Sequence, residues 1–151
     1  MRRYIYGLVA VLGGGCGTST GLSAGDLYGT WTVTSGAEVF RLDNGNVQTN
    51  DLKGAKISLA PVAEGISVAD IDLCVLKFEL HESTATLMAG QKCSVVVCAN
   101  GGVETWSSYT LRSSDMANMT LTSTSTIASD GEKINCKGST SAVLIKTAAW
   151  P

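Results

Sequence analysis

Hydrophobic and polar residues alternate along most of this chain from Leu27 onward, which is the pattern of half-buried β-strands. The segment 74–80 shows it most clearly, because every second residue there is a cysteine, a leucine or a phenylalanine. Short stretches rich in Gly, Asn, Asp and Ser separate such segments and predict turns. Roughly eight to ten strands are expected, at 30–34, 39–42, 56–59, 65–68, 74–80, 84–88, 93–98, 103–112, 118–127 and 133–146.

Short strands joined by short turns predict an antiparallel meander within a single β domain, residues 27–151. The expected fold class is therefore all-β, and two architectures fit it: a closed barrel or a two-sheet sandwich. We favour the barrel, because the strong last strand, 133–146, can pair with the first strand and remove both sheet edges.

The N-terminal segment departs from this alternation. Arg2 and Arg3 are followed by an apolar run, 4–12, and by three glycines, 13–15. Basic, apolar and then small is the order of a secretory signal peptide. The apolar run is too short for a membrane span, which needs about 20 residues. We therefore expect residues 1–15 to be a signal peptide that is removed on export.

The stretch 12–16, Leu-Gly-Gly-Gly-Cys, resembles a bacterial lipobox, whose cysteine becomes the lipidated first residue of the mature protein. This resemblance implies that Cys16 carries lipid and anchors the chain to a membrane. The lipobox prefers leucine three residues before the cysteine, whereas here that position is Gly13 and Leu12 lies one residue earlier. Cleavage without lipidation therefore remains an alternative.

The residues after the lipobox-like cysteine bear on location. In Gram-negative lipoproteins an aspartate at the next position resembles a retention signal for the inner membrane, and this chain has Gly17 there instead. The resemblance therefore favours anchoring in the outer membrane. Residues 16–26 are small and polar, and they predict a flexible tether between the anchor and the domain.

The cysteine count supports export and predicts cross-links. Of five cysteines, Cys16 belongs to the lipobox-like stretch, which leaves an even set of four: Cys74, Cys93, Cys98 and Cys136. Four cysteines in an oxidising compartment predict two disulfides, in any of three connectivities. Folding the strand that begins at Cys74 back through a turn brings Cys93 opposite it. We therefore favour the pairs Cys74–Cys93 and Cys98–Cys136, and no metal site.

Gly29-Thr30-Trp31 opens the first predicted strand. Gly-x-Trp at this place resembles the signature of the lipocalins and calycins, in which the tryptophan plugs one end of an eight-stranded barrel. The resemblance implies that Gly29 and Trp31 form such a plug, with an arginine or lysine near the last strand stacked on the indole. Arg112 and Lys146 both fit that role. The alternative is that Trp31 is an ordinary core aromatic at the start of a strand.

Charge and candidate chemistry narrow the function further. Charged residues are only 16% of the chain and its formal net charge is −2, more negative once Arg2 and Arg3 are removed. Without a basic patch, a nucleic acid is not an expected partner. The single histidine, His81, lies in a predicted turn, and Asp70 and Asp72 are interpreted as solvated acids. We expect no catalytic residue and no cofactor.

Two strands carry side chains that could form recognition surfaces. Trp106 and Tyr109 are three residues apart, so strand parity places them on opposite faces and leaves one of them exposed. A row of hydroxyls is expected on the outer face of the strand 118–127, with apolar residues facing inward: Thr120, Thr122, Thr124 and Thr126 outside, and Met119, Leu121 and Ile127 inside.

The function expected from these features is that of a non-enzymatic binding or structural module of the cell envelope. One alternative is a lipocalin-like carrier of a small apolar ligand. Another is an exported protease inhibitor, since small exported barrels with Gly-x-Trp resemble the bacterial metalloprotease inhibitors. That family inserts a free N-terminus into its target, which a lipidated Cys16 would not offer. A large apolar cavity would favour the carrier, and a filled interior would favour contacts through the surface with another envelope protein.

Overall fold

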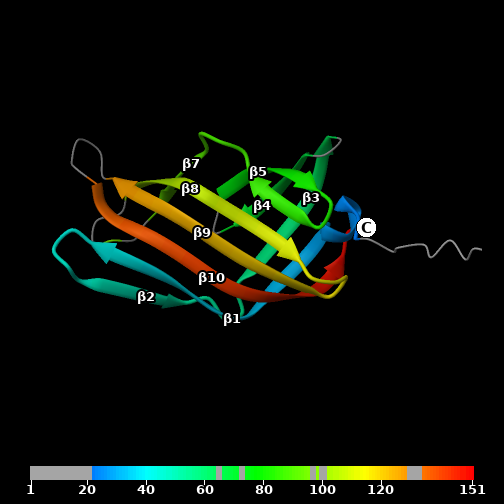
Figure 1. Ribbon diagram of the computed structural model, residues 1–151, viewed down its shortest axis with the longest axis horizontal. Helices are drawn as coiled ribbons and strands as arrows, with labels where there is room; N and C mark the ends of the chain where they lie inside the picture. Colours follow the sequence, from blue (N-terminus) through cyan, green and yellow to red (C-terminus); the bar gives the residue numbers. More distant parts are fainter. Residues whose placement is uncertain (1–21, 64–65, 72–73, 96–97, 99–101, 129–133) are drawn as a thin grey trace, which may run out of the picture.

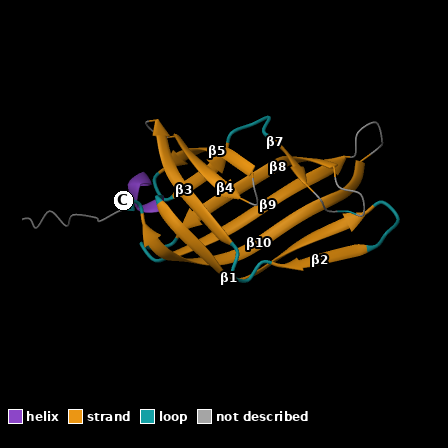
Figure 2. Ribbon diagram, turned by 180° about the vertical axis from the view of Figure 1, so that it is seen from behind, coloured by secondary structure: helices purple, strands orange, loops and turns teal. Residues whose placement is uncertain are grey.

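The chain folds into an antiparallel β-sheet preceded by one short 3₁₀-helix, η1 (Ala24–Leu27) (Figures 1 and 2). The computed structural model describes residues 22–63, 66–71, 74–95, 98, 102–128 and 134–151. The strands in chain order are β1 (Gly29–Leu42), β2 (Val47–Asp51), β3 (Lys56–Ala63), β4 (Ile66–Ile71), β5 (Cys74–His81), β6 (Thr84–Leu87), β7 (Lys92–Val95), β8 (Gly102–Ser113), β9 (Asn118–Ala128) and β10 (Ile134–Ala149). The all-β antiparallel fold expected from the sequence is confirmed.

Strand pairing mostly follows chain order, as in a meander. The sheet runs β10-β9-β8-β6-β5-β4-β3-β1-β2, with β7 paired to β8 beside this path. Strand β1 has three partners. One of its edges pairs with β3 near Gly29 and with β2 from Ala37 onward, and β10 pairs with it along its whole length, from Gly29↔Ala149 to Leu42↔Cys136. The first and last strands are therefore neighbours.

The side chains on the inner face form two apolar clusters. The larger cluster lies toward η1 and is built from alternate residues of the strands together with the helix: Leu27, Trp31, Val33, Ile57, Leu59, Leu76, Phe78, Ala85, Tyr109, Leu111, Met119, Leu121, Ala142 and Leu144. The smaller cluster contains Phe40, Cys98, Ile127 and Cys136. Alternation along β9 matches the expectation, since Met119, Leu121 and Ile127 are buried while Thr120, Thr122 and Thr124 are exposed.

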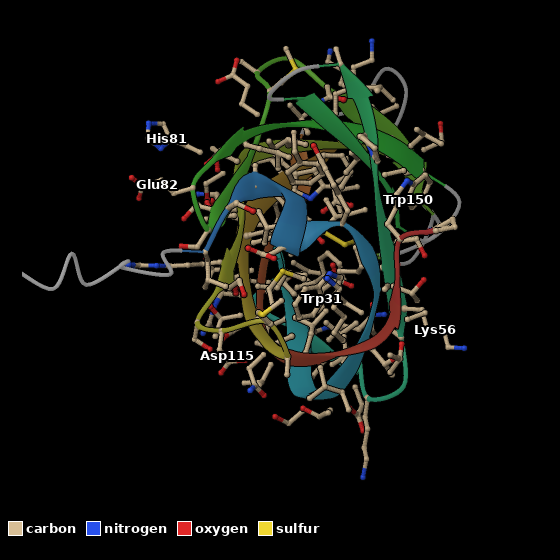
Figure 3. All side chains as sticks on the ribbon, turned by 90° about the vertical axis from the view of Figure 1, so that its right-hand side faces the viewer. Trp31, Lys56, His81, Glu82, Asp115 and Trp150 are labelled. Atoms are coloured by element: carbon tan, nitrogen blue, oxygen red, sulfur yellow. A yellow bond between two sulfur atoms is a disulfide. The ribbon has the colours of Figure 1, made fainter. Side chains whose placement is uncertain are left out.

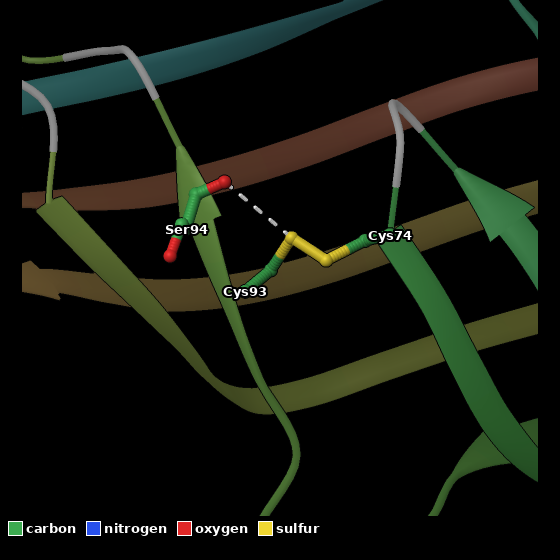
Figure 4. Close-up of a disulfide and its surroundings, with 3 residues drawn as sticks. All are labelled: Cys74, Cys93 and Ser94. Carbon is green, nitrogen blue, oxygen red and sulfur yellow. Dashed lines mark hydrogen bonds between the residues drawn. A yellow bond between two sulfur atoms is a disulfide. The ribbon is translucent and has the colours of Figure 1, made fainter.

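Two disulfides cross-link the sheet, in the pairs favoured from the sequence. Cys74 at the start of β5 is bonded to Cys93 on β7 (Figure 4), and Cys98 is bonded to Cys136 on β10. The Cα–Cα separations are 6.1 and 6.3 Å, within the roughly 4.4–6.8 Å usual for disulfides. Bonds of this kind persist in oxidising compartments, which indicates an exported protein. Within the described residues, no helix has the length and apolar character needed to cross a membrane.

Two expectations from the sequence are wrong. The tether was expected to extend through residue 26, but residues 24–26 belong to η1. Trp106 and Tyr109 were expected on opposite faces, yet Tyr109 is buried and Trp106 packs against the same core cluster. A register shift between Trp106 and Ser108 inserts an extra residue into β8 and resets its alternation. The two rings meet edge to face, with centroids 6.3 Å apart.

The disulfides should stabilise the domain, and the one that closes the longer loop should contribute somewhat more. Those loops span 19 residues for Cys74–Cys93 and 38 for Cys98–Cys136. Chain-entropy estimates give a loss of about 3 kcal/mol for Cys74→Ala/Cys93→Ala and about 4 kcal/mol for Cys98→Ala/Cys136→Ala. Urea unfolding of the oxidised protein measures both, with Cys16→Ser as a control that should leave stability unchanged. Equal stability of all three variants would show that neither disulfide stabilises the domain.

Candidate functional site

Trp31 occupies the end of the sheet where β1 begins. Its side chain is fully buried, and the indole Nε1 donates a hydrogen bond of 2.8 Å to the carbonyl oxygen of Leu27. Leu27 is the last residue of η1, so this bond fixes the helix over the tryptophan. Figure 3 looks onto this end of the molecule, with Trp31 near its middle.

Lys146, and not Arg112, is the cation that lies on the tryptophan. Trp31 and Lys146 are direct partners in the pairing of β1 with β10, and the Lys146 Nζ lies 5.3 Å from the centroid of the indole ring. The same ammonium donates a hydrogen bond of 2.7 Å to the backbone carbonyl of Asp26. Arg112 is exposed and lies in a separate pocket. Lys146 therefore connects the last strand to both the tryptophan and η1.

Gly29 is required by the path of the lysine side chain. Its φ of +131° is one that residues with a side chain rarely adopt. A Cβ placed there would lie 2.9 Å from Cε of Lys146 and would collide with the carbonyl oxygen of Ala148. The glycine of the Gly-x-Trp motif thus leaves space for the lysine to reach the indole. Gly29, Trp31 and Lys146 act together as one packed unit, called the Trp31 latch below.

Asp26 stabilises η1, the helix to which Trp31 and Lys146 of the latch are hydrogen-bonded. Its carboxylate Oδ2 accepts hydrogen bonds from the backbone N–H of Ser23 at 2.7 Å and from the Ser23 hydroxyl at 3.0 Å. The Ser23 backbone bond chiefly, and then the hydroxyl bond, hold the pKa of Asp26 below its ordinary value, while desolvation opposes them and Lys146 adds a smaller lowering effect. The acid is therefore a structural cap.

A pocket of about 620 Å³ opens beside the latch, where the N-terminal segment meets two turns. Its lining mixes one apolar side chain, two opposite charges and three hydroxyls: Leu22, Glu82, Ser83, Arg112, Ser113 and Ser114. Glu82 stands in the β5–β6 turn with a φ of +51°, and Arg112 lies opposite the first residue of β6. We call this hollow the Arg112 pocket.

Polar residues line the inner face of the sheet between the two apolar clusters. The strand registers place Glu38, Thr140, Ser123 and Tyr109 in one row across β1, β10, β9 and β8. Glu104 also lies on the inner face of β8 and is only 5% exposed. Neither glutamate was predicted from the sequence as a functional residue. The alternation of side chains along a strand could have predicted their inward position, because each lies two residues before an aromatic residue of the same strand.

Two serines in this polar region are buried. Ser123 and Ser125 are each 5% exposed, and neither hydroxyl is hydrogen-bonded within the part of the chain that the structure describes. The ring of Phe40 and the Ser125 hydroxyl both approach Gly138, where a side chain would collide with them. Buried hydroxyls of this kind commonly bind ordered water. The middle of the inner face is therefore polar, which is unsuitable for an apolar ligand.

The candidate residues for catalysis and anchoring include one on the surface, one on a strand and two outside the described residues. His81 is exposed as expected, but it is the last residue of β5, paired with Thr84, and the turn itself begins at Glu82. Asp70 lies on β4, while Asp72 and Cys16 fall outside the described residues. No group of three or more metal-ligating side chains occurs among the described residues. The structure brings the two glutamates to the inner face but leaves His81 outside.

Removing the ammonium of the latch should weaken the fold. Lys146→Met keeps the apolar stem but loses the contact with Trp31 and the hydrogen bond to Asp26, so we expect a loss of about 1–2 kcal/mol of unfolding free energy. Lys137→Met is the matched control, because Lys137 is exposed on the same strand. Its effect should stay within about 0.5 kcal/mol. Chemical denaturation compares the two, and equal effects would show that the latch contributes nothing.

The Asp26 cap should make stability depend on acid. Because the folded-state pKa lies below the ordinary value of about 3.9, the stabilisation is present above about pH 4 and is lost as the pH falls through the folded-state pKa. Asp26→Asn should therefore be less stable than the parent at pH 6 and closer to it at pH 3. Asp43→Asn, in the exposed β1–β2 turn, is the control. Urea midpoints at both pH values test this, and a constant difference would contradict it.

Comparison with known proteins found no family model, no curated protein and no solved structure that matches this chain. The geometry offers three places for function: the Trp31 latch, the Arg112 pocket beside it and the polar region of the inner face. The first two share one end of the sheet, the end at which the N-terminal segment enters the domain.

Proposed function

We propose that this protein is an exported lipoprotein of the cell envelope whose β domain acts as a non-enzymatic binding or structural module. In this proposal residues 1–15 are a signal peptide and Cys16 carries the lipid. Residues 17–23 connect the anchor to η1, and Gly17 directs the protein to the outer membrane. The module then works at a membrane surface and contacts other envelope proteins.

The pairing of the cysteines is the observation that carries this proposal. All four cysteines of the described domain are used in two disulfides, so none of them is left to pair with Cys16. Oxidised cysteines support an exported, oxidising compartment for the domain. An additional cysteine directly after a basic, apolar and small segment then has the chemistry of a lipid attachment site.

We further propose that the domain is a closed barrel related in plan to the lipocalins and calycins. The continuous pairing of β10 with β1, and of β1 with β3, supports closure. The Trp31 latch supports the resemblance, because a glycine, a buried tryptophan and a cation from the last strand meet as that signature implies. A two-sheet sandwich would not need its first and last strands paired along their length.

The side chains on the inner face favour binding of other proteins through the outer surface over transport of an apolar ligand. Large side chains such as Trp31, Phe78 and Leu144 pack together at one end, and Phe40 packs with a disulfide at the other. The region between them carries serines and glutamates. An apolar ligand would have to displace the large apolar side chains, or it would leave the serines and glutamates without polar partners. Protease inhibition is disfavoured because lipid on Cys16 would occupy the N-terminus.

The mature N-terminus tests the anchoring directly. Mass spectrometry of protein purified from membranes should find a chain that begins at Cys16 and carries lipid. Cys16→Ser should abolish the modification and release the protein from the membrane fraction, while leaving the two disulfides intact. An unmodified chain that begins downstream of Cys16 would refute the lipoprotein proposal.

A further inference from the structure

The proposed anchor restrains one end of the domain close to the membrane. Six peptide units separate Cys16 from Leu22, the first described residue, and a fully extended chain of that length spans about 20 Å. Leu22 lines the Arg112 pocket, at the end of the sheet that also holds η1 and the Trp31 latch. A lipid on Cys16 would therefore keep this end within about 20 Å of the bilayer surface.

Exposed apolar side chains stand at the same end. Met116, in the loop between β8 and β9, is 66% exposed, and Trp150, directly after β10, is 46% exposed. Figure 3 shows Trp150 and Asp115, the residue before Met116, on opposite sides of the end that holds Trp31. Tryptophan is enriched at the headgroup level of membranes, where its ring enters the apolar boundary and its N–H remains in contact with water.

The charges of the Arg112 pocket suit a zwitterionic headgroup. Arg112 and Glu82 both line it, yet among the described residues neither side chain has an ion-pair or hydrogen-bond partner. A guanidinium binds phosphate through paired hydrogen bonds, and a carboxylate accepts hydrogen bonds from a primary ammonium. Phosphoethanolamine carries both groups. Ser83 adds a hydroxyl that can donate to a phosphate oxygen, whereas the Ser114 hydroxyl already donates to the carbonyl oxygen of Asn118 at 3.4 Å.

The oxygens of Asp115 are used within its own loop and do not compete for the polar groups of a lipid. Its carboxylate is folded back into its own loop, where it accepts hydrogen bonds from the backbone N–H groups of Ala117 and Asn118 and from the Asn118 side chain, at 2.7 to 3.0 Å. These bonds lower the pKa of Asp115, the Asn118 side chain most strongly, so the group remains ionised but occupied.

We propose, on the basis of the lipoprotein function above, that this end of the domain seats on the bilayer, with Met116 and Trp150 in the headgroup layer and a phosphoethanolamine headgroup in the Arg112 pocket. The domain is then held upright on the membrane, with the β1–β2 turn and the Cys98–Cys136 end directed away from it. The lipid on Cys16 attaches the domain to the membrane, and the contacts of Met116, Trp150 and the Arg112 pocket orient it.

The test uses the full lipidated protein reconstituted into vesicles of phosphatidylethanolamine and phosphatidylglycerol that contain a brominated lipid. Trp150 fluorescence should be quenched at least twofold, and Trp150→Phe should remove that quenching, since Trp31 is fully buried and Trp106 is half-buried against the core of the sheet. Met116→Ser and Arg112→Gln should each reduce the quenching at least twofold. Val75→Ser is the matched control, because Val75 is 68% exposed at the opposite end of β5 and should have no effect. Replacing phosphatidylethanolamine by phosphatidylcholine, whose ammonium cannot donate a hydrogen bond, should act like Arg112→Gln.

The outcomes separate this inference from the function on which it rests. A chain that carries lipid on Cys16 but shows no quenching of Trp150 would refute the seating and leave the lipoprotein proposal standing. Quenching that ignores Arg112→Gln and phosphatidylcholine would refute the headgroup pocket. A chain without lipid on Cys16 that remains soluble beside the vesicles would overturn both proposals.

Discussion

The pairing between β1 and β10 is the constraint on which the other features of this structure depend. It joins the two ends of the folded chain along the whole of β1, from Gly29 to Leu42. At one end it sets Lys146 beside Trp31, and further along it sets Thr140 beside Glu38 and Gly138 beside Phe40. The latch, the polar region and the smaller apolar cluster therefore each include neighbouring residues from this one pair of strands. Without that register, none of these contacts would form.

Strand alternation was the part of the fold that the sequence specified best. β9 and β5 alternate without interruption, so their buried faces could be predicted, and the hairpin that leads from Cys74 to Cys93 made one disulfide pair predictable. The bulge in β8 could not be predicted, because one extra residue between Trp106 and Tyr109 changes the face without changing the composition. The alternation of residues no longer predicts which side chains are buried once the register of a strand shifts.

The candidate site was predicted in part. Gly29 and Trp31 were found from their spacing, but the choice of Lys146 over Arg112 depends on the register of two strands far apart in sequence. The helix η1 was missed because its four residues are too few to show a helical period, and its cap depends on a hydrogen bond from Ser23 to Asp26. The inward glutamates were missed because acidic residues in strands are ordinarily assigned to the solvent face.

The two ends of the domain differ in character, and this difference links fold to proposed function. One end holds η1, the Trp31 latch and the Arg112 pocket, next to the segment that leads back to Cys16. The Cys98–Cys136 disulfide and the smaller cluster cover the other. Strand β1 is hydrogen-bonded on both of its edges, and this double pairing holds the sheet rigid enough to present its outer surface. Nuclear Overhauser contacts of the β1 amides test this double pairing. Cross-strand contacts are expected from Thr30 and Thr32 to both β3 and β10, whereas contacts to one of these strands alone would contradict it.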